Sequence, residues 1–254
     1  MEIAAVFVLG LIVGSFANVC IYRIPKCLSI VRPGSRCPRC GRPVRPYDNV
    51  PILSYLVLRG RCRDCGARIS PRYPMVELAC GLGFVAVVLT RPDPWSSAVG
   101  CMFVTLMVVV ALVDLDHRII PNRVVLVGAV LGFLAAPVVS PGLPGAILGG
   151  LVGGGTLLGV ALVYRWTTGV EGMGAGDIKF MAMAGLFLGW RGALFTIFVA
   201  ALVGTLVGLG LMAFGGHGRR TAVPFGTFLA PAGVLVWLAG DDLIRWYLAT
   251  LASA

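Results

Sequence analysis

Residues 95–114 read WSSAVGCMFVTLMVVVALVD, a hydrophobic run that ends in a carboxylate. The run is long enough for a transmembrane helix, which needs roughly 20 apolar residues. A second carboxylate, Asp177, follows Met173-Gly-Ala-Gly and opens another hydrophobic run. Ionisable groups near lipid are costly, and they usually mark functional sites. If Asp114 and Asp177 meet, they suggest a pair that shares a proton, which is the acid–base chemistry of an aspartic protease.

Composition and hydropathy are typical of a polytopic membrane protein. The 254 residues have a mean hydropathy of +0.92 and are 58% hydrophobic and 13% charged, which excludes an ordinary soluble globule. We predict an all-α fold with about eight transmembrane helices. The first segment carries Glu2 and has no convincing small-residue cleavage site, so we expect a retained helix rather than a signal peptide. The predicted segments are residues 2–22, 75–90, 96–114, 123–140, 145–164, 178–190, 192–214 and 222–248.

The basic residues predict the orientation of these helices. With the N-terminus outside, the loop of residues 23–72 places twelve Lys and Arg residues in the cytoplasm. The whole chain then has eighteen basic residues on the cytoplasmic side and three outside, as the positive-inside rule requires. Attraction to anionic lipid explains the net charge of +10, so we expect a lipid bilayer and no nucleic acid as partner. The cytoplasmic residues beyond the loop are Arg118, Arg123, Arg165, Lys179, Arg219 and Arg220, and the outer ones are Arg91, Arg191 and Arg245.

This topology brings the two carboxylates to one face of the membrane. Asp114 ends the third segment and Asp177 begins the sixth, so two crossings separate them and both lie at the cytoplasmic boundary. An active site there acts on something presented from the cytoplasm. Glycines four residues apart, Gly149 with Gly153 and Gly150 with Gly154, predict close packing between helices.

The residues next to each carboxylate have expected roles of their own. Asp116 is two positions from Asp114 and points to the opposite side of a helix, so we expect a supporting or solvated group rather than the reacting one. Gly174 and Gly176 allow backbone conformations that other residues avoid, and they allow a peptide to approach closely. Asp177 itself is expected to cap the helix that begins at residue 178.

Four of the eight cysteines form two C-x-x-C pairs, Cys37 with Cys40 and Cys62 with Cys65, separated by 21 residues. This spacing is typical of a four-cysteine zinc ribbon. Disulfides are the alternative, and a reducing cytoplasmic location disfavours them. We therefore predict a structural zinc ion that holds a cytoplasmic loop with little hydrophobic core of its own.

Further motifs extend over nearly the whole chain, and together they resemble those of the type IV prepilin peptidases. These are bifunctional leader peptidase and N-methyltransferases, and they belong to the intramembrane aspartyl proteases with a Gly-x-Gly-Asp motif. The motifs, in order, are Gly14-Ser-Phe-Ala-Asn18 with Tyr22-Arg-Ile-Pro25, Asp48-Asn-Val-Pro51, Arg59-Gly-Arg-Cys62, Ile69-Ser-Pro-Arg-Tyr-Pro74 with Glu77, Asp114-Leu-Asp-His-Arg-Ile-Ile-Pro121, Glu171-Gly-Met-Gly-Ala-Gly-Asp177-Ile-Lys179 and Val223-Pro-Phe-Gly226.

The resemblance implies a function and a place for it. Asp114 and Asp177 match the catalytic aspartates, with Gly174, Gly176, Asp116 and Lys179 as support. The implied substrates are prepilins or pseudopilins, cleaved at the cytoplasmic face of the bacterial inner membrane. The new N-terminal residue is then methylated with S-adenosylmethionine as the methyl donor.

We expect two domains and keep two alternative functions open. Residues 1–74 form the first helix and the cysteine loop, associated with methyltransfer, and residues 75–254 form the peptidase. The alternatives are a peptidase without methyltransferase activity and a proton-coupled membrane transporter. Two departures from the family are Thr227, where a proline is common, and Asn122, where an acidic residue is common. We expect neither to touch the carboxylate pair.

Overall fold

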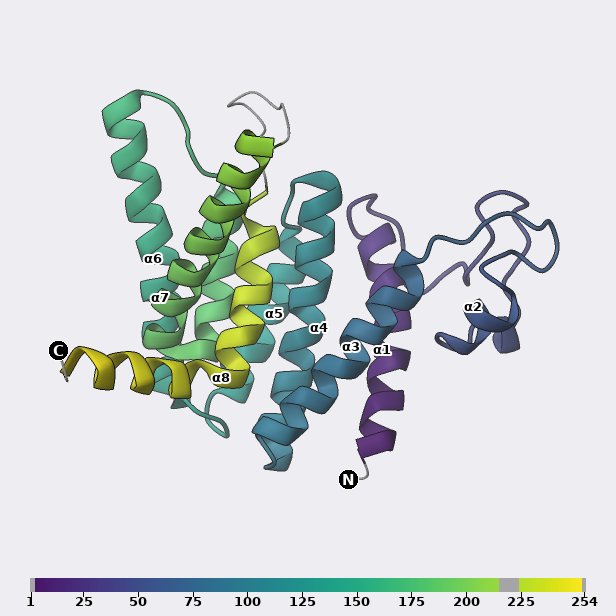
Figure 1. The fold of residues 1–254 in the computed structure, drawn as a ribbon, viewed down its shortest axis with the longest axis horizontal. Helices are drawn as coiled ribbons and strands as arrows, with labels where there is room; N and C mark the ends of the chain where they lie inside the picture. The colour runs from purple at the N-terminus through teal and green to yellow at the C-terminus, as the bar shows by residue number, and fades with distance from the viewer. Residues whose placement is uncertain (1–2, 215–223, 253–254) are drawn as a thin grey trace. The chain divides into compact units, whose positions relative to one another are not determined.

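The structure, a computed structural model, describes residues 3–214 and 224–252. Within these ranges the chain is helical and has no β-strand beyond two isolated bridges, which confirms the predicted all-α class (Figure 1). Arg219, Arg220 and Val223 lie outside the described residues. The helices are α1 (Ile3–Arg23), a short 3-10 helix (Pro46–Asp48), α2 (Leu53–Val57), α3 (Arg72–Thr90), α4 (Pro94–His117), α5 (Asn122–Ala135), α6 (Gly142–Thr168), α7 (Ala175–Phe214) and α8 (Gly226–Ala252).

The predicted hydrophobic segments correspond to helices or half-helices. In the described ranges, α1, α3, α4, α6 and residues 175–213 of α7 are long and apolar enough to cross a membrane, and α5 and residues 226–240 are shorter apolar helices. Helix α7 is interrupted at Gly189, where φ is 68° and ψ is 175°. The predicted segments 178–190 and 192–214 are therefore its two halves.

Two helix ends differ from the expectation, and both lie at the carboxylates. Helix α4 continues beyond Asp114 to His117, so Asp114 lies in its last turn. Helix α7 begins at Ala175, so Asp177 lies in the first turn and is not the capping residue that the sequence suggested.

The first of two compact units comprises residues 1–92, in which α1 and α3 pack antiparallel. A Cβ at Gly14 would lie 2.7 Å from Cα of Glu77, so only glycine fits there. Four residues further along α1, the side chain of Asn18 donates to the carbonyl of Tyr73 at 3.1 Å. This unit includes α3 and so ends later than the boundary expected at residue 74, because α3 packs along α1. The functional division at that boundary stays a prediction.

The second unit comprises residues 93–254, and in it α6 and α7 lie side by side (Figure 1). A Cβ at Gly149 would collide with the carbonyl oxygen of Gly185, and one at Gly153 would lie 2.7 Å from the carbonyl oxygen of Met181. The two backbones are therefore in contact, which confirms the packing predicted from the glycine spacing.

Aromatic rings join α4, α7 and α8 in the core of this second unit. The ring of Phe103 lies 5.0 Å from that of Phe187 and 5.5 Å from that of Trp237, measured between centroids. Such contacts add to the packing energy of the buried side chains. They hold α4, α7 and α8 together. The ends of these helices carry Asp114, Asp177 and Thr227.

Candidate active site

Asp114 lies in the last turn of α4 and is 5% exposed. Its Oδ2 atom accepts a hydrogen bond from the backbone N–H of Thr227 at 3.0 Å, and the Thr227 hydroxyl lies 3.5 Å from the same oxygen. Thr227 is the second residue of α8. Because the first N–H groups of a helix have no partner within the helix, Asp114 supplies one and places its charge at the positive end of α8.

Asp177 lies in the first turn of α7, and its backbone N–H donates to the carbonyl of Gly174 at 3.2 Å. Neither Gly174 nor Gly176 adopts a left-handed φ, so conformational freedom does not explain these glycines as we expected. Gly176 is required for a close approach instead, since a Cβ there would lie 3.2 Å from Cβ of Ile120.

Asp114 lies at the end of α4 and Asp177 at the start of α7. Ile120, in the turn after α4, contacts both regions: a Cβ at Gly176 would lie 3.2 Å from its Cβ atom, and a Cβ at Gly226 would lie 3.0 Å from its Cδ1 atom. The Cβ at Gly226 would also lie 2.7 Å from Oδ2 of Asp114. Ile120 therefore lies between the residue before Asp177 and the residue that contacts Asp114. Two carboxyl groups in this arrangement can take and give a proton on one substrate.

Gly226 and Thr227 were not predicted as site residues. Gly226 was assigned only to a family motif, and Thr227 was expected to leave the carboxylate pair untouched, which the hydrogen bond to Asp114 shows to be wrong. The sequence did contain an indication of this site. Pro224-Phe-Gly226 marks the start of an apolar helix, and the start of a helix is a common anion-binding site.

The other two expected support residues have different settings. Asp116 is exposed on the last turn of α4. Lys179 donates from Nζ to Oδ1 of Asn122 at 3.3 Å. Asn122, which stands where an acidic residue is common in the family, therefore contacts α7 through Lys179. Lys179 and Asn122 also line one end of an open apolar groove of about 730 Å³ between α5, α6 and α7.

The four cysteines of the first unit form two similar turns. The N–H of Gly41 donates to the carbonyl of Cys37, and the N–H of Gly66 donates to that of Cys62, both at 2.9 Å. Both glycines have positive φ, 70° and 66°, which other residues rarely adopt. Each C-x-x-C pair is therefore held in the same tight turn, with two sulfurs on one side.

The sulfur positions fit a tetrahedral metal ion. The four Sγ atoms lie within 4.8 Å of one another. Zn–S bonds of about 2.3 Å in a tetrahedron separate the sulfurs by roughly 3.8 Å, and Cys37 Sγ lies 3.8 Å from Cys65 Sγ. Backbone N–H groups of Cys40 and Arg39 lower the pKa of the Cys37 thiol to about 6, which favours the thiolate that a metal needs. The cluster could hold a metal ion.

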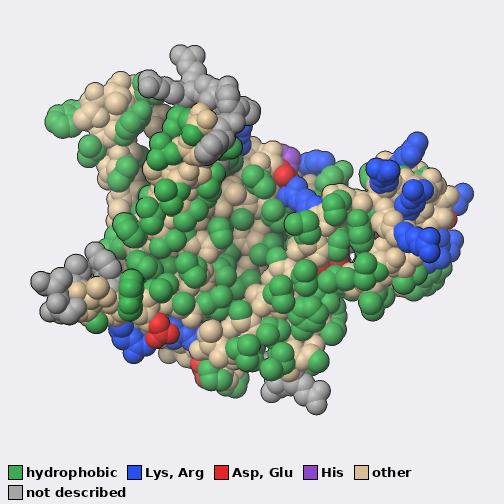
Figure 2. Space-filling model, viewed as in Figure 1, with side chains coloured by type: hydrophobic (Ala, Val, Ile, Leu, Met, Phe, Trp, Pro, Cys, Tyr) green, Lys and Arg blue, Asp and Glu red, His purple; other side chains and the backbone are tan. Residues whose placement is uncertain are grey.

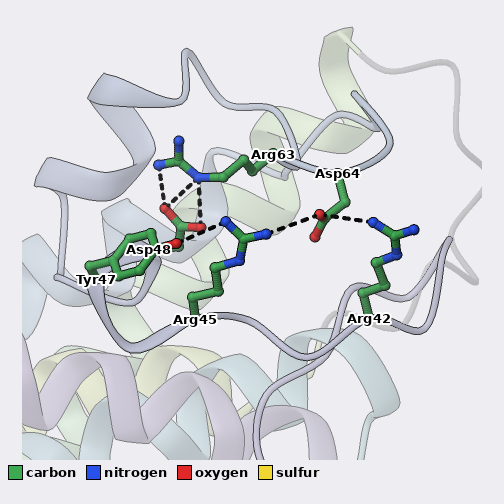
Figure 3. Close-up of polar contacts among 6 residues, drawn as sticks. All are labelled: Arg42, Arg45, Tyr47, Asp48, Arg63 and Asp64. Carbon is green, nitrogen blue, oxygen red and sulfur yellow. Dashed lines mark hydrogen bonds and ion pairs between the residues drawn. The ribbon is translucent and has the colours of Figure 1, made fainter.

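Ion pairs tie the second cysteine turn to the segment that follows the first (Figure 3). Arg63 donates from Nε and Nη2 to the carboxylate of Asp48 at 2.6–3.0 Å. Arg42 and Arg45 lie 3.1 and 3.6 Å from Asp64 Oδ1. The hydrogen bonds from Arg63 hold the pKa of Asp48 below its usual value. These contacts join the two halves of the loop independently of a metal.

Known proteins match this chain over most of its length. Residues 8–91 match the bacterial peptidase A24 N-terminal domain, and residues 101–209 match the type IV leader peptidase family. The prepilin leader peptidase/N-methyltransferase of Aeromonas hydrophila is 36% identical over 270 residues, which cover 96% of this chain and 92% of that protein. The corresponding protein of Bacillus subtilis is 35% identical over 97% of this chain and 98% of its own length.

A third relative, the prepilin leader peptidase/N-methyltransferase of Myxococcus xanthus, is 44% identical over 85% of this chain and 65% of its own length. No solved structure matches the chain. The apolar helices agree with a membrane protein. The chain belongs to the type IV leader peptidase family, and the relatives that align with nearly its whole length are prepilin leader peptidase/N-methyltransferases.

Proposed function

We propose that this chain cleaves the leader peptide of type IV prepilin-like proteins and then methylates the new N-terminal residue. The proposal is supported by the position of Asp114 at the end of α4 and of Asp177 at the start of α7, with Ile120 in contact with Gly176 and Gly226 between them. Its support comes also from relatives whose names state both activities.

In the proposed mechanism the two carboxyl groups divide the proton transfers between them. The N–H of Thr227 and the start of α8 keep Asp114 ionised. The ionised carboxylate can then act as the base and take a proton from water. The oxygen of that water attacks the scissile carbonyl carbon, and Asp177 supplies the proton that the leaving amine needs when the C–N bond breaks. The free amine then accepts a methyl group from S-adenosylmethionine, and one proton is released.

We further propose that the cysteine cluster holds zinc and that residues 1–74 serve methyltransfer while residues 75–254 serve cleavage. Four cysteine ligands leave no open position, so the ion would be structural. It would fold a loop in which apolar side chains such as Val31 and Val57 remain exposed. The sulfur spacing and the repeated turns support this assignment.

The proposed location is the bacterial inner membrane, with the N-terminus outside and the carboxylates at the cytoplasmic face. The distribution of basic residues supports this orientation, because twelve of them lie between residues 23 and 72. Prepilins or pseudopilins would then present their leaders from the cytoplasm.

The test is mass spectrometry of a prepilin incubated with the purified protein and S-adenosylmethionine. We expect loss of the leader together with the mass of one methyl group, and neither change with Asp114→Asn or Asp177→Asn. Loss of the leader alone would identify a peptidase without methyltransferase activity. Unchanged prepilin with the wild-type protein, combined with proton uptake that needs both carboxylates, would identify a transporter instead.

A further inference from the structure

The short helix α2 in the cysteine loop has an apolar face that the first unit does not cover. Leu53, Leu56 and Val57 are 61, 62 and 75% exposed. Their spacing of three and four residues puts them on one side of the helix. Ser54, about 100° around the helix from Leu53, is buried and binds the loop through the carbonyl of Tyr47 and the N–H of Val50, each at 3.0 Å.

A strained turn sets the direction in which α2 leaves the loop. Ile52, just before α2, has φ 59° and ψ −51°, and the N–H of Leu53 bonds to the carbonyl of Pro51 at 2.5 Å. This is a γ-turn with positive φ, which is rare and strained. Strain of this kind persists only where the surroundings hold it. Here the N–H of Ile52 donates to Oε2 of Glu77 at 2.8 Å, and Glu77 is only 8% exposed on α3.

The contact with Glu77 fixes the depth of α2 along the helix pair. Glu77 is five residues inside α3, or roughly 7.5 Å along its axis from Arg72. It is also level with Gly14, nine residues before α1 ends at Arg23. The loop therefore folds back toward α3 at Ile52, and Figure 1 draws α2 below the level at which α1 ends.

Charge separates from apolar surface within the same loop. Figure 2 shows Lys and Arg side chains over its upper part and hydrophobic side chains along its lower edge. Arg59 and Arg61, which follow α2 directly, are exposed. Basic side chains next to an apolar helix face are typical of segments that lie in the interface of an anionic membrane, with the apolar face about 5–10 Å below the headgroups.

We propose that α2 is an interfacial anchor, in which Leu53, Leu56 and Val57 insert into the acyl-chain region of the bilayer that α1 and α3 cross. Counted from the start of α3, Glu77 lies roughly 7.5 Å along the helix, within the range of about 5–10 Å expected for such an anchor. Glu77 is then a positioning residue, because its carboxylate holds the turn that aims α2 at the lipid. The occupant of the apolar face is the lipid of the same membrane, with anionic headgroups beside the arginines.

The test uses the full chain in nanodiscs of phosphatidylcholine and phosphatidylglycerol, with the photoreactive residue p-benzoylphenylalanine in place of Leu56. A matched control carries it in place of Val31, which is 77% exposed in the same loop and follows the end of α1. We expect phospholipid adducts several-fold more often at position 56 than at position 31. Equal labelling, or cross-links from position 56 to another part of the chain or to a second copy, would overturn the proposal.

A second pair of variants tests the anchor without depending on the probe position alone. Glu77→Gln keeps an oxygen that can accept from Ile52, whereas Glu77→Ala removes it. With the probe at position 56, we expect lipid adducts to persist in the first variant and to fall several-fold in the second. Unchanged adducts in a folded Glu77→Ala protein would show that Glu77 does not hold α2 at the membrane.

Discussion

The hydrogen bond from Thr227 to Asp114 can be removed by a change of a few atoms. Thr227→Pro deletes both the N–H and the hydroxyl, and proline is tolerated in the first turn of a helix, where Thr227 lies. Thr227→Val deletes the hydroxyl only. The comparison of the two variants therefore isolates the backbone N–H, which lies 3.0 Å from Oδ2 of Asp114.

The expected magnitude follows from the two distances. A hydrogen bond to a charged group contributes about 1.5–3 kcal/mol. Its loss lowers the ionised fraction of Asp114, and with it the rate of a step in which Asp114 acts as the base, by up to roughly 10- to 150-fold. The hydroxyl, at 3.5 Å, is at the limit of a useful hydrogen bond and contributes little. In this chain, which has a backbone N–H where proline is common in the family, we expect kcat/KM for leader cleavage to fall by up to roughly 10- to 150-fold in Thr227→Pro and to stay within about 3-fold of wild type in Thr227→Val.

The assay is cleavage of a prepilin, followed by gel or mass spectrometry at several substrate concentrations. Asp114→Asn serves as the inactive control, and size-exclusion profiles in detergent show that each variant is folded. Equal kcat/KM for Thr227→Pro and Thr227→Val would refute the role of the N–H in charge stabilisation at Asp114.

Three further predictions concern glycines and the metal. Gly226→Ala places a methyl group 2.7 Å from the carboxylate of Asp114 and should lower the rate of leader cleavage by at least roughly 100-fold. Its control is Gly208→Ala, whose methyl group meets no atom within 4 Å and should leave the rate unchanged in the same assay. Gly149→Ala should destabilise the protein by about 1–3 kcal/mol because it pushes α6 and α7 apart. Gly155→Ala, on the same helix with nothing within 4 Å, is its control in thermal unfolding. Cys62→Ser should remove zinc, measured by elemental analysis, and should reduce methylation more than cleavage; equal loss of both would contradict the proposed division of labour.

Hydropathy predicted the helices well. In lipid, the backbone N–H and C=O groups of a long apolar segment of this kind find hydrogen-bond partners only within a helix. Hydropathy could not place the start of α7. The helix begins at Ala175 and includes Gly176, although both residues belong to a glycine-rich motif. It did place the division of α7 within two residues of Gly189, but it did not identify Gly189 as the dividing residue, because glycine also occurs within intact helices of this chain, as at Gly153. Such boundaries depend on contacts between helices.

The sequence was enough to predict Asp114 and Asp177 as a candidate pair, but not the contacts around them. Asp114 and Asp177 stand out because charge is rare in this chain. The backbone donor to Asp114 belongs to Thr227, 113 residues away, and no local pattern predicts such a contact. A threonine in place of the usual proline appeared neutral only because the sequence does not show which N–H faces the carboxylate.

The glycine contacts between α6 and α7 also bear on the chemistry. Gly154 and Gly150 lie against the first half of α7, where a Cβ at Gly154 would be 3.4 Å from the carbonyl oxygen of Ile178, the residue after Asp177. Backbone contact of this kind leaves little freedom for the helix to shift. Because a carboxylate displaced by about 1 Å can cost roughly 100-fold in rate, the small residues of α6 position Asp177 as well as stabilise the fold. Gly154→Ala should therefore reduce cleavage more than its effect on thermal stability accounts for, and a proportional loss of both would show that the contact is structural only.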